Sequence, residues 1–283
     1  MRKFRDISDR LRQEPHKLRF VLSRLLWTTG LCRFITFSFP AGYRMRFYPS
    51  AISAGLWRDR HFRSEDADFV TGYLRPGETF VDVGANVGQL SLVAARRVTS
   101  SGRTIAIEAH PRTCNFLRGN VRLNNFPTEI HNVAVGSRSG ELFFTNFRSD
   151  DMNFAAAAPP RNGSALRVPV VTLDSILRER PVDLLKVDVE GFECDLIEGA
   201  ARTLDNCRCL YIEDSEPNLQ RAGRSRAELY DRLIDRGFQL FHVRGKQLER
   251  ASVRPGSLVT ENLIAVRASA LPETLARTGF CLA

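Results

Sequence analysis

From about residue 79 onward, apolar and polar positions follow two periodicities, one typical of buried strands and one typical of helices. Short apolar runs typical of buried strands are expected at 79–83, 103–108 and about 128–135. Segments with helical spacing separate them, at 88–98 and from Pro111 to near Asn125. Consecutive parallel strands need a crossover connection, which is usually a helix. The alternation therefore predicts a parallel sheet with crossover helices.

The second half of the chain continues this alternation of strand and helix patterns after one interruption. Strands are expected at 140–147 and 166–171, and residues 150–164 between them are rich in Ala, Asn, Pro and Gly. We interpret this segment as a long hairpin whose tip is either a lid or simply flexible. Four further strands are expected at 183–189, 210–214, 238–243 and 262–266. The predicted fold is an α/β, Rossmann-like, seven-stranded doubly wound sheet that finishes in an antiparallel hairpin.

Composition fits one domain with an extension. The chain has 283 residues, 43% of them hydrophobic, enough to bury one sizeable core. No apolar run can span a bilayer, because Arg19 and Arg24 interrupt the best candidate, residues 18–31. The same arginines disfavour a signal peptide. The six cysteines form no C-x-x-C pair and no zinc-like spacing, so we expect reduced thiols, no metal site and a cytoplasmic location.

The N-terminal segment holds most of the excess positive charge. Residues 1–33 contain nine basic and three acidic side chains, a net +6 of the total +9. Apolar residues recur at helical spacing, with Pro15 as a break: Phe4, Ile7, Leu11, Leu18, Leu22 and Leu25. Two interpretations fit, an arm that contacts a membrane surface or a polyanion, and a solvated helix whose apolar side packs on the main domain. We favour the packed helix.

A strand, a tight turn and a helix start follow one another in Phe80-Val-Asp-Val-Gly-Ala-Asn-Val-Gly88. Gly84 allows a sharp turn and the close approach of a ligand, and Asn86 tolerates left-handed backbone geometry. The helix start beyond Gly88 offers free N–H groups and a partial positive charge. Glu108, at the end of the next strand, can accept hydrogen bonds from both ribose hydroxyls. Together these positions predict a nucleoside-containing cofactor.

The spacing of the turn indicates which nucleoside binds. Turns that bind NAD usually read G-x-G-x-x-G, because the pyrophosphate lies against the backbone. Here the pattern is Asp82-x-Gly84-x-Asn86-x-Gly88, and the Asp82 carboxylate would repel a pyrophosphate. The same carboxylate suits the ammonium group of a methionine moiety, directly or through water. The turn therefore predicts S-adenosylmethionine, with Asn132 as a further candidate near the adenine or, alternatively, as a turn cap.

Four motifs resemble, in order and spacing, the FkbM family of class I methyltransferases. They lie at 81–88, 132–136, 171–174 and 185–191, and the resemblance covers about residues 45–265. The Asp-Val-Glu-Gly element within 185–191 is the most specific of them. The resemblance implies a class I S-adenosylmethionine-dependent methyltransferase that acts on hydroxyl groups of sugars, glycolipids, polyketides or other small natural products.

The strand expected at 183–189 carries unusual charge. Lys186, Asp188 and Glu190 alternate, so they are expected on one face of the sheet, near the carboxyl end where ligands bind. Burying unpaired charges is costly, so these groups should be paired or face a cavity. Methyl transfer to a hydroxyl needs alignment and removal of the hydroxyl proton. We predict that Asp188 or Glu190 orients the acceptor or acts as base, and that Lys186 holds one of them.

The alternative for these three charged residues is a structural ion network that braces the sheet. For Glu190 the two interpretations stand equal, whereas for Asp188 we favour the functional one. Glu213 and Asp214 end the fifth strand, where they either line the same rim or are solvated acids. His110 fits the start of a helix better than a catalytic base.

The domain plan and the partners follow from these assignments. We expect a basic extension over 1–60, helical and then irregular or strand-like, and a C-terminal tail over 269–283. A methyltransferase domain over 61–268 carries the inserted hairpin at about 140–171. The expected partner is a small-molecule or glycan hydroxyl acceptor. The basic charge motivates an RNA methyltransferase as an alternative, although no RNA-binding module is recognisable, and a non-catalytic scaffold on the same fold is a second alternative.

Overall fold

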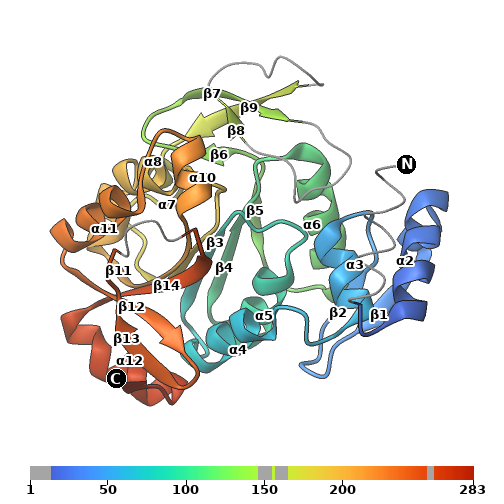
Figure 1. The fold of residues 1–283 in the computed structure, drawn as a ribbon, viewed down its shortest axis with the longest axis horizontal. Helices are drawn as coiled ribbons and strands as arrows, with labels where there is room; N and C mark the ends of the chain where they lie inside the picture. The colour runs from blue at the N-terminus through green and yellow to red at the C-terminus, as the bar shows by residue number, and fades with distance from the viewer. Residues whose placement is uncertain (1–13, 146–154, 157–164, 254–257) are drawn as a thin grey trace.

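A nine-stranded sheet forms the centre of the computed structural model, which describes residues 14–145, 155–156, 165–253 and 258–283. The strand order is β15-β13-β12-β14-β11-β10-β3-β4-β5 (Figure 1). The parallel strands are β3 (Thr79–Val83), β4 (Arg103–Ile107), β5 (Glu129–His131), β10 (Val182–Val187) and β11 (Cys207–Ser215). Their carboxyl ends lie at one edge of the sheet, which is where open α/β sheets bind ligands.

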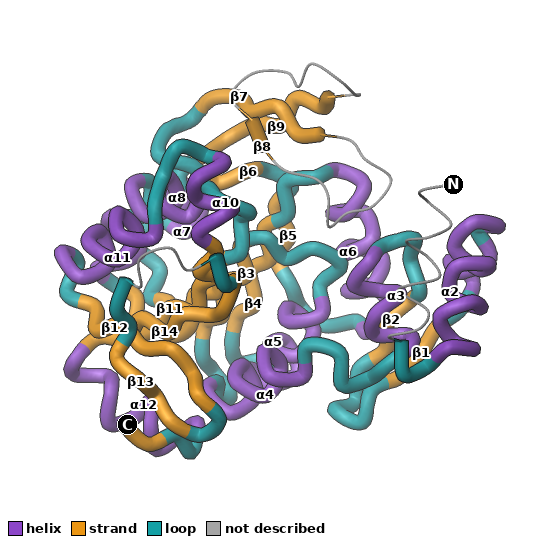
Figure 2. Tube along the Cα trace, in the orientation of Figure 1, coloured by secondary structure: helices purple, strands orange, loops and turns teal. Residues whose placement is uncertain are grey.

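The C-terminal part of the sheet contains the antiparallel hairpin that the sequence predicted, from β11 through β14 to β12. Strand β14 (Thr260–Arg267) lies between β11 and β12 (Phe238–Arg244) and runs opposite to both. Two short edge strands, β13 (Gln247–Arg250) and β15 (Cys281–Leu282), extend the sheet beyond the seven expected strands, as Figure 2 shows in orange. The segment expected as a tail thus supplies a helix, α12 (Leu271–Thr278), and an edge strand.

Helices cover both faces of the sheet. One core contains Phe80 of β3 together with side chains of α4, α5, α6 and α12, whereas the next residue, Val81, belongs to a second core with α7, α8, α9 and α11. This alternation along one strand is what a sheet buried on both sides requires. The helices of the first face are α4 (Ser64–Tyr73), α5 (Gln89–Val98), α6 (Pro111–Asn124) and α12. Those of the second are α7 (Leu173–Leu177), α8 (Glu193–Glu198), α9 (Ala201–Asp205) and α11 (Arg226–Asp235).

A second, four-stranded sheet has the order β6-β9-β7-β8. Its strands are β6 (Ala134–Val135), β7 (Gly140–Thr145), β8 (Ala155–Ala156) and β9 (Ala165–Val171). The antiparallel pairing of β7 with β9 confirms the expected hairpin, whereas most of its tip lies outside the described residues. One prediction is wrong here, because the strand expected at 128–135 is divided between two sheets. The amide of Asn132 donates to the carbonyls of Glu108 and Ala109 and holds the chain where it leaves the main sheet.

The N-terminal segment forms helix α2 (Lys17–Thr29), a short 3-10 helix (Leu31–Phe34), the hairpin of β1 (Thr36–Ser38) and β2 (Arg44–Arg46), and helix α3 (Ala51–Arg58). The prediction that Leu18, Leu22 and Leu25 pack on the main domain is wrong, because all three are exposed. The buried side of α2 carries Phe20 and Ser23 instead. The candidates Phe4, Ile7 and Leu11 lie outside the described residues. Within the described part of the chain, no helix has the length and apolar character needed to cross a membrane.

A buried polar network joins β11, α11 and β12 on the side of the sheet away from the cavity described below. Asp214, fully buried, accepts hydrogen bonds from Arg226 Nε at 2.5 Å and from the Tyr230 hydroxyl at 2.7 Å. The same hydroxyl lies 2.9 Å from His242 Nε2. Asp214 therefore does not line the rim suggested by its position in the sequence.

Removing the carboxylate of Asp214 is expected to destabilise the fold strongly. Asp214→Ala leaves the buried Arg226 guanidinium without its ion-pair partner, which costs about 3–5 kcal/mol of unfolding free energy. Urea denaturation of the variant and the wild type measures this difference. Glu141→Ala is the matched control, because Glu141 pairs with Arg167 at an exposed site and its loss costs at most about 1 kcal/mol. Equal losses in the two variants would contradict the prediction.

Candidate active site

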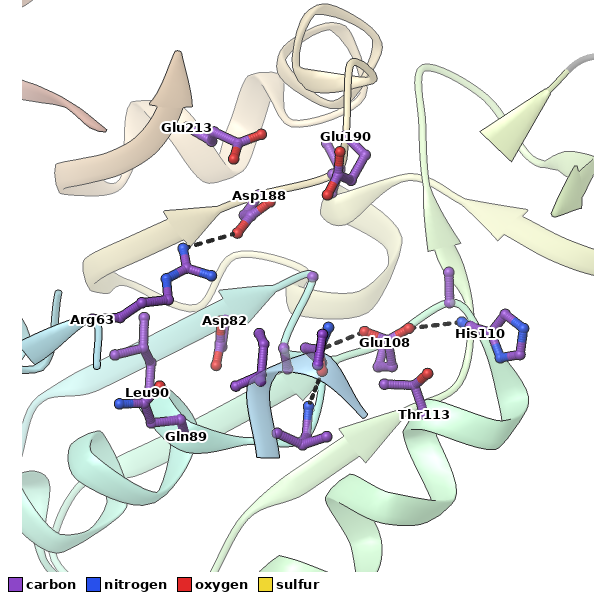
Figure 3. A pocket seen from close by; sticks show the side chains of 18 of the residues that line it. Arg63, Asp82, Gln89, Leu90, Glu108, His110, Thr113, Asp188, Glu190 and Glu213 are labelled. Carbon is purple, nitrogen blue, oxygen red and sulfur yellow. Dashed lines mark hydrogen bonds and ion pairs between the residues drawn. The ribbon is translucent and has the colours of Figure 1, made fainter. Parts of the chain in front are cut away.

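A cavity of about 630 Å³ lies at the carboxyl ends of β3, β4 and β10 (Figure 3). Its floor is the turn that follows β3, together with Glu108 and the end of β10. Residues of α2 and α3 form one wall, and Leu142 and Phe144 of β7 contribute apolar side chains to another. This size suits a small-molecule site, for which pockets of roughly 300–1,000 Å³ are usual.

The turn after β3 has the backbone geometry that its sequence predicts. Gly84, Asn86 and Gly88 have φ values of 83°, 49° and 89°, all in the left-handed region. A Cβ atom on Gly84 would lie 1.8 Å from the carbonyl oxygen of Asp188, so only glycine allows β3 and the end of β10 to approach this closely. The result is an open cradle of backbone between the two strand ends, in front of the first turn of α5.

Asp82 lies in the floor of this cradle and is almost completely buried. Its Oδ2 accepts a hydrogen bond from the hydroxyl of Ser91 on α5 at 2.5 Å. Its Oδ1 accepts no hydrogen bond from any residue that the structure describes. Burial raises the pKa of Asp82, and the nearby charge of Lys186 opposes this rise. A buried carboxylate with an unused oxygen is an arrangement that a cationic ligand group would complete.

Glu108 follows β4, and its carboxylate stabilises the backbone of the cradle. Its Oε2 accepts a hydrogen bond from the backbone N–H of Asn86, and its Oε1 accepts one from the N–H of His110, each at 2.8 Å. The side chain lines the cavity, as the ribose-binding prediction requires. Asn132 is placed differently, because its amide is used on backbone carbonyls while Val133 and Ala134 line the cavity in its place. The structure therefore favours the turn-cap interpretation of Asn132.

Lys186, Asp188 and Glu190 all line the cavity, but not through strand alternation. Strand β10 ends at Val187, two residues earlier than expected, and Asp188 and Glu190 belong to the turn beyond it. Glu190 has a left-handed φ of 56°, which is uncommon for a residue other than glycine. The turn, rather than the pleat of a strand, aims Asp188 and Glu190 at the cavity.

Asp188 is held between two cations. Lys186 Nζ lies 3.0 Å from Asp188 Oδ2, and Arg63 Nη2 lies 3.7 Å from the same oxygen. Burial alone would raise the pKa of Asp188, but the positive charges of Lys186 and Arg63 lower it. Asp188 is therefore ionised at neutral pH, and the predicted role of Lys186 as its partner agrees with this geometry.

Arg63 is a cavity residue that the sequence analysis missed. It precedes α4 and donates to Asp66, whose carboxylate also accepts hydrogen bonds from the Tyr211 hydroxyl and the Asn262 amide. Asp66, which binds Arg63, is thus itself held by a residue 196 positions away, Asn262. The only signal in the sequence was the spacing of Arg63 and Asp66 at a helix start, which is common on protein surfaces.

Glu213 of β11 completes a group of three carboxylates with Asp188 and Glu190. Each offers one oxygen, and these oxygens all lie within 4.8 Å of one another, a set that could also hold a divalent cation. Burial, followed by the charges of Asp188 and Glu190, raises the pKa of Glu213 to about 8. The amide of Asn218 donates to both Glu190 and Glu213, at 2.9 and 3.2 Å. Because the pKa of Asp188 is lowered and that of Glu213 is raised, an ionised Glu213 accepts a proton more readily than Asp188 does.

Comparison with known proteins identifies the family. The family model of the methyltransferase FkbM domain matches residues 82–240, which is more than half of the chain. The chain belongs to the FkbM methyltransferase family. The match includes the cradle, Glu108, the end of β10 and Glu213, and it confirms S-adenosylmethionine as the cofactor and the Rossmann-like class I fold.

Three curated relatives of this FkbM-family chain carry informative names. The chain is 29% identical over 148 residues to Methyltransferase 1 of Beauveria bassiana, a match that covers 44% of this chain and 59% of the relative. It is 23% identical over 198 residues to the hexuronic acid methyltransferase AglP of Haloferax volcanii, covering 65% and 76%. It is 27% identical over 159 residues to the 31-O-demethyl-FK506 methyltransferase FkbM of Streptomyces tacrolimicus, covering 44% and 60%. The chain thus spans about three fifths of the first and the third relative.

Proposed function

We propose that this FkbM-family protein methylates a hydroxyl group of a sugar, a glycolipid or a polyketide-type small molecule. The observation that carries the proposal is the convergence of Asp188, Glu190 and Glu213 beside the cofactor cradle. A hydroxyl acceptor must lose a proton during methyl transfer, and carboxylates are suitable bases for this step. The names of two relatives, which specify a hexuronic acid and 31-O-demethyl-FK506, support the same class of acceptor.

The cradle residues suit the cofactor that the family uses. S-adenosylmethionine, when bound, supplies a methyl group on a positively charged sulfur. Gly84 allows the turn after β3 to close against the end of β10, Glu108 lines the cavity with a carboxylate that can accept hydrogen bonds from ribose hydroxyls, and Asp82 provides negative charge for the methionine ammonium group. These assignments use the residues predicted from the sequence, with Asn132 as a support of the cradle rather than a contact.

Two of the three carboxylates, Asp188 and Glu213, have different tasks in this proposal. Asp188, kept ionised by Lys186 and Arg63, orients the acceptor hydroxyl and is too weak a base to remove its proton. Glu213 has the raised pKa that a base needs and takes the proton as the new C–O bond forms. Lys186 and Arg63 are positioning residues, because they fix the carboxylate of Asp188.

Release of S-adenosylhomocysteine in the presence of candidate acceptors tests the proposed activity. The panel contains uronic acid glycosides, a macrolide with a free hydroxyl, a primary amine and a short RNA. We expect turnover with a hydroxyl acceptor, and an O-methyl signal in the carbon NMR spectrum of the product. Methylation of the amine or of RNA, or of carbon in any acceptor, would overturn the assignment to hydroxyl groups.

A further inference from the structure

Helix α2 exposes a continuous apolar stripe. Leu18, Val21, Leu22 and Leu25 follow one another at spacings of three and four, so they share one face of the helix. All four are exposed, Leu18 to 82% and Leu25 to 58%. Leu31 and Phe34 continue the exposed surface beyond the end of the helix. Among the residues that the structure describes, six of the twelve exposed large apolar side chains lie in this one segment, 18–34.

The opposite face anchors α2 to the protein. Phe20 and Ser23 are buried, and Trp27 packs against the main core. The guanidinium groups of Arg24 and Arg58 lie over the ring of Phe20, 5.5 and 5.2 Å from its centroid. Figure 1 shows α2 at the edge of the molecule, beside α3. Because the anchoring face is already occupied, the apolar stripe points away from the domain.

The segment of the chain that carries the stripe is strongly basic. From residue 15 to residue 58 the chain contains seven lysines and arginines and no aspartate or glutamate. Lys17 and Arg19 are exposed, and at 100° per residue they lie on either side of the stripe. An apolar face bordered by cations matches the interface of a bilayer that contains anionic lipids. Two copies of this face would instead bring like charges together, which disfavours dimerisation through it.

We propose that α2 docks this protein on the surface of an anionic phospholipid bilayer. The apolar stripe enters the boundary between headgroups and acyl chains, and the flanking cations contact lipid phosphates. Phe20, Arg24 and Trp27 of the same helix line the active-site cavity, so docking places the cavity directly behind the lipid-facing helix.

Co-sedimentation with vesicles tests this proposal. We expect the full chain to bind vesicles of equimolar phosphatidylcholine and phosphatidylglycerol more strongly than vesicles of phosphatidylcholine alone. Raising the salt from about 0.1 M to about 1 M shortens the screening length from about 10 Å to about 3 Å and should weaken this binding. The triple variant Leu18→Gln, Leu22→Gln, Leu25→Gln should lose at least about tenfold in vesicle partition.

Ile234→Gln is the matched control. Ile234 is 55% exposed on α11, which lies at the other side of the molecule from α2 in Figure 1, and its replacement should leave vesicle binding unchanged. Binding of S-adenosylmethionine by calorimetry reports whether each variant is folded. The vesicles contain no acceptor, so this experiment is independent of the proposed methyl transfer. Absence of vesicle binding, equal binding by the triple variant, or a dimer that this variant converts to a monomer would each overturn the proposal.

Discussion

Glu213→Gln is expected to lower kcat by about 10²–10⁴-fold, the range that a positioned general base contributes. Glutamine has nearly the same shape and can still accept the hydrogen bond that Asn218 donates, but it cannot take a proton. Affinity for S-adenosylmethionine should be unchanged, because the cradle lies on other residues. Steady-state rates with a hydroxyl acceptor, together with calorimetry for the cofactor, measure the two effects separately.

The pH profile gives a second measurement on the same residue. The pKa of Glu213 is raised to about 8, so below this pH the ionised, proton-accepting fraction falls about tenfold per pH unit. We therefore expect kcat of the wild type to rise with pH up to about 8 and then to level off. The variant should lack this rise. Glu179→Gln, at an exposed position that does not line the cavity, is the control. A variant that kept both the rate and the profile would exclude Glu213 as the base.

Asp188→Asn is expected to lower kcat by about 10²-fold, because a misplaced acceptor oxygen costs a factor of this order. The substitution removes the negative charge that Lys186 and Arg63 hold in place. It also removes a charge that raises the pKa of Glu213. The rise of kcat with pH should therefore move to lower pH in the variant, an effect that simple loss of structure does not produce.

Two outcomes would contradict the role of Asp188. Unchanged turnover in a variant that binds the cofactor normally would make the Lys186–Asp188 pair purely structural. A profile with its midpoint at the wild-type pH would show that Asp188 and Glu213 do not interact. Thermal unfolding of the variant is the necessary check, because removing one partner of a buried ion pair also destabilises the fold.

The sequence determined the fold largely through local patterns. The strand and helix periodicity predicted the central sheet and its antiparallel end, because each element is specified by its own residues. The cradle was predicted for the same reason, since Gly84, Asn86 and Glu108 follow strand ends that the pattern locates. The edge strands β13 and β15 were not predicted, because they are short and are stabilised by pairing with the neighbouring chain segments.

Features that depend on distant contacts were the ones that sequence reasoning misjudged. Arg63 reaches the cavity because Asp66 is held by Tyr211 and Asn262, and no local pattern reports such a contact. Glu213 and Asp214 are neighbours on one strand and point in opposite directions, but periodicity alone does not say which one faces the cavity. Leu18, Leu22 and Leu25 of α2 have the spacing expected of a packed helix face. The face of α2 that packs on the protein instead carries Phe20 and Trp27.

The ion pair between Arg63 and Asp188 joins a residue outside the segment that matches the family model to a residue inside it. Asp188 lies inside the segment 82–240 that matches the family model, whereas Arg63 precedes it by 19 residues. The helices α2 and α3, which wall the cavity, also lie upstream of that segment. The matched segment contains Gly84, Glu108 and Glu213, but neither the Arg63 cation nor the cavity wall that α2 and α3 form. Part of the shape and charge of the cavity is therefore set by residues upstream of position 82, outside the segment that identifies the family.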